Sequence, residues 1–197
     1  SGEIIITMDA DSVLVTNDWL ESHINKHDSA QTLVGGWVTI RNPISFFQRI
    51  QAVELMALNG VSSAMTSVNK SIAISGSNLS YEKESFLQLD PYSDNKDVLS
   101  GDDIFLLHKA KRNHYRIKCC FEKEMEVETE PVSLKKYISQ RVRWLKKRSS
   151  FQDLTTVCVG LLLFFANLNF LFLAVIGLFL TELHTILLVS LFLKIGI

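Results

Sequence analysis

Two aspartates one residue apart, Asp9 and Asp11, follow a short apolar run near the start of the chain. In an extended chain, residues i and i+2 point the same way, so both carboxylates can reach one hard cation. A Mg²⁺ or Mn²⁺ ion held by one or two carboxylates completes its coordination with phosphate oxygens and water. The pair predicts a metal site for a phosphorylated ligand, with two solvated turn residues as the alternative.

Asp103 lies three residues after Ser100, immediately before the apolar run 104–107. This spacing is typical of a capping box, with Ser100 at the N-cap and Asp103 in the first turn of a helix. The helix dipole holds such a carboxylate in its ionised form, and an ionised, fixed carboxylate can accept the proton of a hydroxyl group. Asp103 is therefore a candidate general base that also caps a helix.

Gln140, Arg143 and Trp144 lie in a basic segment, residues 133–150, that its spacing predicts to be a helix. Steps of about 100° per residue place the three side chains on one arc of that helix. A guanidinium group matches the oxygens of a diphosphate, and an indole ring stacks on the flat face of a sugar. The alternative is a helix beside a membrane that uses its basic residues for lipid head groups.

Gly76, Ser77 and Asn78 form a fourth candidate, a turn that follows a predicted short strand at residues 72–74. A glycine before two small polar residues lets the backbone approach a ligand closely, and the Asn78 amide can bind a hydroxyl group. Taken alone, the same residues are compatible with an ordinary turn.

The elements that must position these residues alternate between strands and helices, which indicates an α/β fold. The run 3–8 is rich in β-branched residues and predicts a strand buried on both faces. The helix expected after Pro43 carries an apolar stripe, for which we expect packing in the core rather than contact with a membrane. Further strands are expected at 33–40, 115–119 and 124–127, and further helices after Asn17 or Asp18, after Ser100 and over 133–150.

The chain of 197 residues has 20 basic and 21 acidic side chains, but only three charged residues, Asp153, Glu182 and Lys194, fall within 151–197. We therefore expect a soluble domain at 1–150 and a transmembrane region at 151–197. Residues 157–180 contain no charge and would extend roughly 36 Å as a helix, enough to cross a hydrocarbon core of about 30 Å. A second span, cut short, is expected at 183–197.

The charge next to the expected span predicts its orientation. Between Pro131 and Ser150 the chain has basic residues and no acidic ones, and such a flank stays on the cytoplasmic side of a membrane. We therefore expect a cytosolic domain on the inner, cytoplasmic face of the cell membrane, in a multi-pass protein. The net charge of −1 excludes a basic nucleic-acid coat, and 47% hydrophobic residues exclude a disordered chain.

The order of these motifs, followed by a span, resembles the family 2 glycosyltransferases with a GT-A fold, which include membrane-bound synthases of cellulose and hyaluronan. The resemblance rests on Asp9-Ala10-Asp11 (DxD), Gly76-Ser77-Asn78-Leu79 (a GxNL-like turn), Gly101-Asp102-Asp103 (the GED-like position) and Gln140-x-x-Arg143-Trp144 (QxxRW). It implies a Rossmann-like nucleotide-diphospho-sugar transferase domain and inverting transfer of a sugar from a nucleotide-sugar to a glycan or lipid-linked acceptor. Nucleic acid is not an expected partner, whereas membrane lipids are.

The resemblance also implies a role for each residue. Asp9 and Asp11 would hold Mg²⁺ or Mn²⁺ with the diphosphate of the donor, and Asp103 would be the general base. Gln140 and Arg143 would contact the leaving diphosphate. The acceptor and sugar would lie against residues that the motifs also supply: Trp144, Asp102, Gly76, Ser77 and Asn78.

Two features depart from the family pattern. The family's domain begins with nucleotide-binding strands ahead of the DxD strand, whereas here only two residues precede Glu3. We therefore expect a fragment, truncated at both ends, that has no activity alone. Asp102 stands where the family more often has glutamate. Two other functions stay open: another metal-dependent diphosphate enzyme, and a non-enzymatic membrane-anchored domain with a lipid-binding basic helix.

Overall fold

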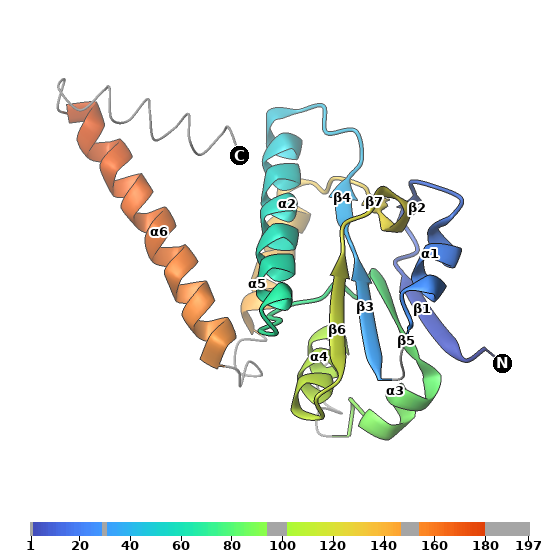
Figure 1. Ribbon diagram of the computed structural model, residues 1–197. Helices are drawn as coiled ribbons and strands as arrows, with labels where there is room; N and C mark the ends of the chain where they lie inside the picture. The colour runs from blue at the N-terminus through green and yellow to red at the C-terminus, as the bar shows by residue number, and fades with distance from the viewer. Residues whose placement is uncertain (1, 29–30, 94–101, 147–153, 180–197) are drawn as a thin grey trace. The chain divides into compact units, whose positions relative to one another are not determined.

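The computed structural model describes residues 2–28, 31–93, 102–146 and 154–179. The chain divides into two compact units, Ser1–Ser150 and Phe151–Ile197. The first is an α/β domain with two sheets, and it carries all the side chains discussed below as a candidate site (Figure 1). The second contains a single described helix.

The main sheet has four strands in the order β1-β5-β3-β6. The run 3–8 forms a strand, as predicted: β1 (Ile4–Met8) pairs antiparallel with β5 (Asn78–Glu82). Its predicted burial on both faces is wrong, because β1 lies at the edge of the described sheet and its residues are at most partly buried. On its other side β5 pairs antiparallel with β3 (Thr32–Gly36), and β3 pairs parallel with β6 (Arg116–Cys120). Every residue of β3 is buried, as expected for a central strand covered on both faces.

Alternate residues of a strand point to opposite sides of the sheet, so both faces carry side chains that can pack against other elements. Helices cover both faces here. Leu33 of β3 packs with Leu107 of α4 (Asp102–Arg112) in the main core. Ser80 of β5 points to the other face, where it contacts His23 of α1 (Trp19–Asn25). The main core consists of the following buried residues: Leu33, Ile74, Leu79, Tyr81, Leu89, Leu106, Leu107, Ala110 and Tyr115.

The second sheet is short and has the order β2-β7-β4, with β2 at Val13–Leu14, β7 at Val127–Thr129 and β4 at Val38–Ile40. The prediction of a single strand at 33–40 is therefore wrong, because this segment forms two strands, β3 and β4, that are separated at Trp37. The Trp37 carbonyl accepts hydrogen bonds from the backbone N–H of Val127 and the side chain of Asn78, so the chain leaves one sheet for the other there.

Three further predictions of local structure need correction. Residues 72–74 form no strand, and a helix that the sequence pattern did not indicate, α3 (Lys83–Leu89), follows β5. The strand expected at 124–127 is a 3-10 turn, η1 (Lys123–Met125), that precedes β7. Residue Ser100, the expected cap of α4, lies outside the described residues.

Helix α2 (Phe46–Ser67) begins with a capping box in which the Ser45 side chain accepts from the N–H of Gln48. It packs along β4 and β6 (Figure 1). The expectation that its apolar stripe packs in the core is wrong, because Phe46 is 81% and Val53 64% exposed. The face toward the domain instead carries polar residues, including the buried Gln51.

The second unit contains α6 (Leu154–Phe179), a helix within the segment for which a membrane span was predicted. Among the helices described by the structure, none combines the length and the apolar character that crossing a membrane requires. The span expected at 157–180 is therefore not confirmed. The second expected span, at 183–197, lies outside the described residues.

Candidate active site

A cavity of about 710 Å³ lies in the first unit, where β1, the turn before β5, the start of α4 and helix α5 (Leu134–Lys146) come together. Its wall contains residues from all four sequence motifs. The predicted site residues that line it are Asp9, Asp11, Gly76, Ser77, Asp103, Gln140 and Arg143. Segments that are far apart along the chain therefore face one space.

The two aspartates of the first motif follow β1 directly. The backbone N–H of Ser12 donates to the carbonyl of Asp9 at 3.0 Å, so the chain turns there while both carboxylates remain at the cavity. Desolvation raises the pKa of Asp9 above its ordinary value, and the negative charges of Asp11 and Asp103 raise it further. Like charges gathered in this way favour the binding of a cation.

In the part of the chain that the structure describes, no three His, Cys, Asp or Glu side chains are grouped so that they alone would hold a metal ion. A pair of carboxylates nevertheless suits Mg²⁺ or Mn²⁺ when phosphate oxygens and water complete the shell. Asp9 and Asp11 supply that pair, and the observation that fits a cation here is that both carboxylate residues line the same cavity as Asp103.

The glycine turn and the candidate base are in direct contact. The N–H of Gly76 donates to Asp103 Oδ2 at 3.3 Å, and the N–H of Ile104 donates to Asp103 Oδ1 at 2.8 Å. The Gly76 carbonyl accepts from Thr7 Oγ1 of β1 at 2.7 Å. A Cβ atom on Gly76 would lie 3.2 Å from the Cβ of Asp103, a tight contact that Asp103 would have to relieve by a shift of a few tenths of an ångström. These contacts fix Asp103 relative to β1.

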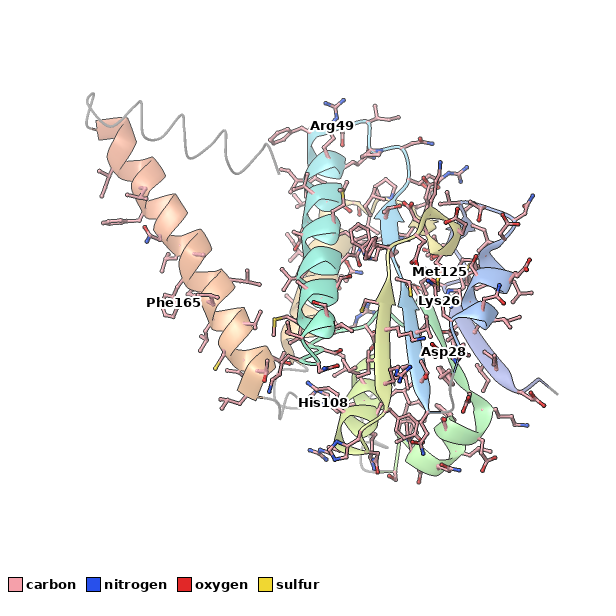
Figure 2. The ribbon with its side chains drawn as sticks, viewed as in Figure 1. Lys26, Asp28, Arg49, His108, Met125 and Phe165 are labelled. Atoms are coloured by element: carbon pink, nitrogen blue, oxygen red, sulfur yellow. The ribbon has the colours of Figure 1, made fainter. Side chains whose placement is uncertain are left out.

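Asn78 does not line the cavity, in contrast to the prediction that it contacts the sugar. Its side chain is 0% exposed and its hydrogen-bonding groups are used inside the fold. Nδ2 donates to the carbonyls of Trp37 and Met125, at 2.8 and 2.7 Å (Met125 is labelled in Figure 2). Oδ1 accepts from Trp19 Nε1 at 3.1 Å and lies 2.9 Å from His23 Nε2. Asn78 therefore holds α1, β5 and η1 together, and we do not assign it to the site.

The α5 wall of the cavity contains more residues than the sequence indicated. Gln140 and Arg143 line the cavity as the helical spacing predicted, and Tyr137 and Arg141 line it as well. Tyr137 lies one turn before Gln140, so the same spacing rule can find it once the helix face is known. The side chains of two further predicted residues, Asp102 and Trp144, lie outside the described part of the structure.

A model of glycosyl transferase family group 2 matches residues 4–196, which is nearly the whole chain. Among curated proteins, none matches the chain significantly in sequence. The matched region contains all four motifs and every residue that lines the cavity.

Proposed function

The chain belongs to glycosyl transferase family group 2, and from this premise we propose that it is an inverting transferase acting on a glycan or lipid-linked acceptor. Membership of the family implies that the sugar comes from a nucleotide-sugar donor. The observation that carries the proposal is the convergence of Asp9, Asp11, Asp103 and Arg143 on one cavity. A nucleotide-sugar needs such a site, because its diphosphate and its anomeric carbon must be bound together.

Asp103 is proposed as the general base. Its carboxylate takes the proton of the acceptor hydroxyl while the hydroxyl oxygen attacks the anomeric carbon of the donor. The bond from that carbon to the diphosphate oxygen breaks, and the nucleoside diphosphate leaves with the electron pair. With Asp9 and Asp11 assigned to the metal, Asp103 as the base fits a single displacement, which inverts the anomeric configuration. A base in this role typically contributes about 10²- to 10⁴-fold in rate.

Gln140 and Arg143 are proposed to bind the leaving diphosphate. Negative charge grows on the leaving group during transfer, and a fixed guanidinium at the cavity wall stabilises it. Asp9 and Asp11 would hold a divalent ion, Mg²⁺ or Mn²⁺, as is typical of the family. When bound, such an ion neutralises the charge of the diphosphate.

The sugar is proposed to lie against the turn at Gly76 and Ser77, which line the cavity beside Asp103. Trp144 and Asp102 remain predicted acceptor contacts on the strength of the family pattern. If the chain were instead a non-enzymatic domain with a lipid-binding basic helix, we would expect the aspartates to face solvent separately. The cavity that Asp9, Asp11 and Asp103 share supports an enzymatic function instead.

We place the reaction at the cytoplasmic face of a membrane, on the sequence pattern alone. The basic residues between Pro131 and Ser150 and the uncharged run 157–180 support this placement. Extraction of cell membranes with alkaline carbonate tests it: the protein is expected to stay in the membrane pellet, and its release into the supernatant would count against a span.

A donor screen tests the proposed function. The protein at its natural length, in membranes, is incubated with a panel of nucleotide-sugars and Mn²⁺, and sugar transfer is measured by mass spectrometry of the products. We expect transfer from one donor by the wild type and none by Asp103→Asn, which keeps the shape of the side chain but cannot accept the proton. Wild-type turnover in Asp103→Asn would remove the assignment of the base.

A further inference from the structure

Two polar residues of α2, Gln51 and Glu54, contact the α5 side of the cavity but belong to none of the four motifs. Gln51 is buried, and its amide makes a pair of hydrogen bonds with the backbone of Val132, two residues before α5 begins. Nε2 donates to the Val132 carbonyl at 2.9 Å, and the Val132 N–H donates to Oε1 at 3.0 Å. This pair fixes the chain at the entry to α5.

Glu54 contacts helix α5 directly. Its Oε2 atom accepts from the hydroxyl of Tyr137 and from Nη2 of Arg141, both at 2.5 Å. The guanidinium carbon of Arg141 lies 4.6 Å from the centre of the Tyr137 ring, and Phe47 of α2 contacts that ring edge-on at 5.4 Å. Because Tyr137 and Arg141 are one helical turn apart, a single carboxylate oxygen fixes one side of α5.

The apolar side of α5 does not take part in this contact. Leu134, Ile138 and Val142 recur at helical spacing and are 58%, 54% and 45% exposed. A helix on the surface of a domain is ordinarily oriented by an apolar stripe that packs against the core. Here the polar contacts with α2 perform that task, so they set the rotation of α5 about its own axis.

The rotation of α5 matters for the site because Gln140 and Arg143 reach the cavity from the same helix. Side chains extend about 5–6 Å from a helix axis, so a rotation of about 20° moves their ends by about 2 Å. Misplacement of a catalytic contact by about 1 Å can cost about 100-fold in rate. A small loss of orientation is therefore enough to remove Arg143 from a bound diphosphate.

We propose that Glu54, supported by Gln51, is a positioning residue that fixes the rotation of α5 and thereby holds Arg143 against the diphosphate of the donor. This inference rests on the proposed function. Glu54 acts through another residue, so its removal weakens diphosphate binding without adding to the effect of removing Arg143.

The test is a double-mutant cycle on the dissociation constant of a nucleoside diphosphate. UDP, GDP and ADP are each titrated with Mn²⁺ into the protein at its natural length, and the one that binds most tightly is used for the variants. We expect Arg143→Ala and Glu54→Ala each to raise the dissociation constant about tenfold, while the double variant binds no more weakly than Arg143→Ala alone. Reversible unfolding raises the apparent dissociation constant only by the reciprocal of the folded fraction, so a variant that circular dichroism shows to be more than half folded would lose at most about twofold through instability alone.

Two milder variants and a control complete the experiment. Glu54→Gln keeps an acceptor for the Tyr137 hydroxyl, and Tyr137→Phe removes only that hydroxyl, so each is expected to weaken binding about threefold. Glu84→Ala removes an exposed glutamate from α3, away from the cavity, and is expected to bind as the wild type does.

The outcomes separate this inference from the proposed function. Weak binding by Arg143→Ala together with wild-type binding by Glu54→Ala and Tyr137→Phe would overturn the positioning role alone. So would a double variant that binds about 100-fold more weakly than the wild type, because the two residues would then act independently. If the wild type bound none of the diphosphates, or Arg143→Ala bound as tightly as the wild type, the proposed function would fail and this inference with it.

Discussion

Replacing Asn78 by alanine should unfold the protein more than it should impair donor binding. The side chain of Asn78 supplies partners to two carbonyl oxygens and to the ring N–H groups of Trp19 and His23, inside the fold. Asn78→Ala leaves all of these groups without that partner. The Trp37 carbonyl still accepts from the Val127 N–H, so three groups are left unpaired. Each buried polar group without a partner costs about 1–3 kcal/mol, so even the lower value gives a loss of about 3 kcal/mol.

That loss is large beside the total stability of a domain, which is about 5–15 kcal/mol. In a chain of this size, 1 kcal/mol shifts the melting temperature by about 2–4 °C. Asn78→Ala should therefore melt about 6–12 °C below the wild type in thermal unfolding followed by circular dichroism. Ser77→Ala is the matched control: Ser77 lines the cavity and shares a hydrogen bond with the hydroxyl of Ser75, so its melting temperature should fall by less than about 4 °C.

The assignment of Asn78 to the fold would be refuted by the opposite pattern. If Asn78→Ala melted with the wild type but showed a higher KM for the donor, its side chain would belong to the sugar site after all. The donor KM of whatever Asn78→Ala protein stays folded at low temperature should instead stay close to that of the wild type.

Four more predictions concern the cavity and the core. Gly76→Ala should lower kcat about tenfold with little change in donor KM, because the new Cβ would lie 3.2 Å from the Asp103 Cβ and push that side chain by a few tenths of an ångström; an unchanged kcat would show that the contact is not critical. Arg143→Lys keeps the charge but loses the two-pronged contact, so kcat/KM for the donor should fall about tenfold, and a neutral result would favour lipid binding by α5. EDTA should abolish transfer and added Mn²⁺ restore it, whereas activity that survives EDTA would count against the aspartate pair as metal ligands. Burial lowers the pKa of His23, and His27 acts in the same direction, so His23 stays neutral in the folded state. The free energy of unfolding should therefore fall as the pH drops below about 6.5, by up to about 1.4 kcal/mol per pH unit for this residue. Urea unfolding at pH 7.5 and 5.5 measures this difference, which His23→Gln should reduce.

Some local elements of the fold were predictable, and their pairing was not. The β-branched run 3–8 predicted the strand β1, because β-branched residues favour an extended chain, but not its place at the edge of the described sheet, where its residues are only partly buried. That β1 pairs with β5, more than 70 residues later, depends on contacts that no local pattern records. The division of residues 33–40 into β3 and β4 has the same origin, since it depends on hydrogen bonds that Trp37 makes with distant residues.

Helix α2 shows the limit of reasoning from periodicity. The spacing of its apolar residues correctly indicates a helix with two different faces. It does not indicate which face packs on the domain, and here Phe46 and Val53 point outward while Gln51 points inward. The polar residues of the inward face form hydrogen bonds with the rest of the domain: Gln51 binds the backbone of Val132, and Asn59 binds the carbonyl of Val38.

The candidate site was predictable where single residues carry the chemistry. Asp9, Asp11, Asp103 and Arg143 were named from their types and spacing, and the structure places them on one cavity. Glu54 was not named, because its contact with Tyr137 joins residues 83 positions apart and follows from the packing of two helices. Asn78 was misassigned since an amide that binds a sugar and an amide that binds backbone carbonyls look alike in a sequence.

An experimental structure of the protein with Mn²⁺ and the nucleoside diphosphate that binds most tightly would test the central claim most directly. We expect the diphosphate in the cavity, with Mn²⁺ between it and Asp9 or Asp11, and with Arg143 on the opposite side of the phosphates. A diphosphate bound elsewhere on the protein, or one that contacts only the aspartates or only α5, would contradict the claim that these separate segments form one donor site.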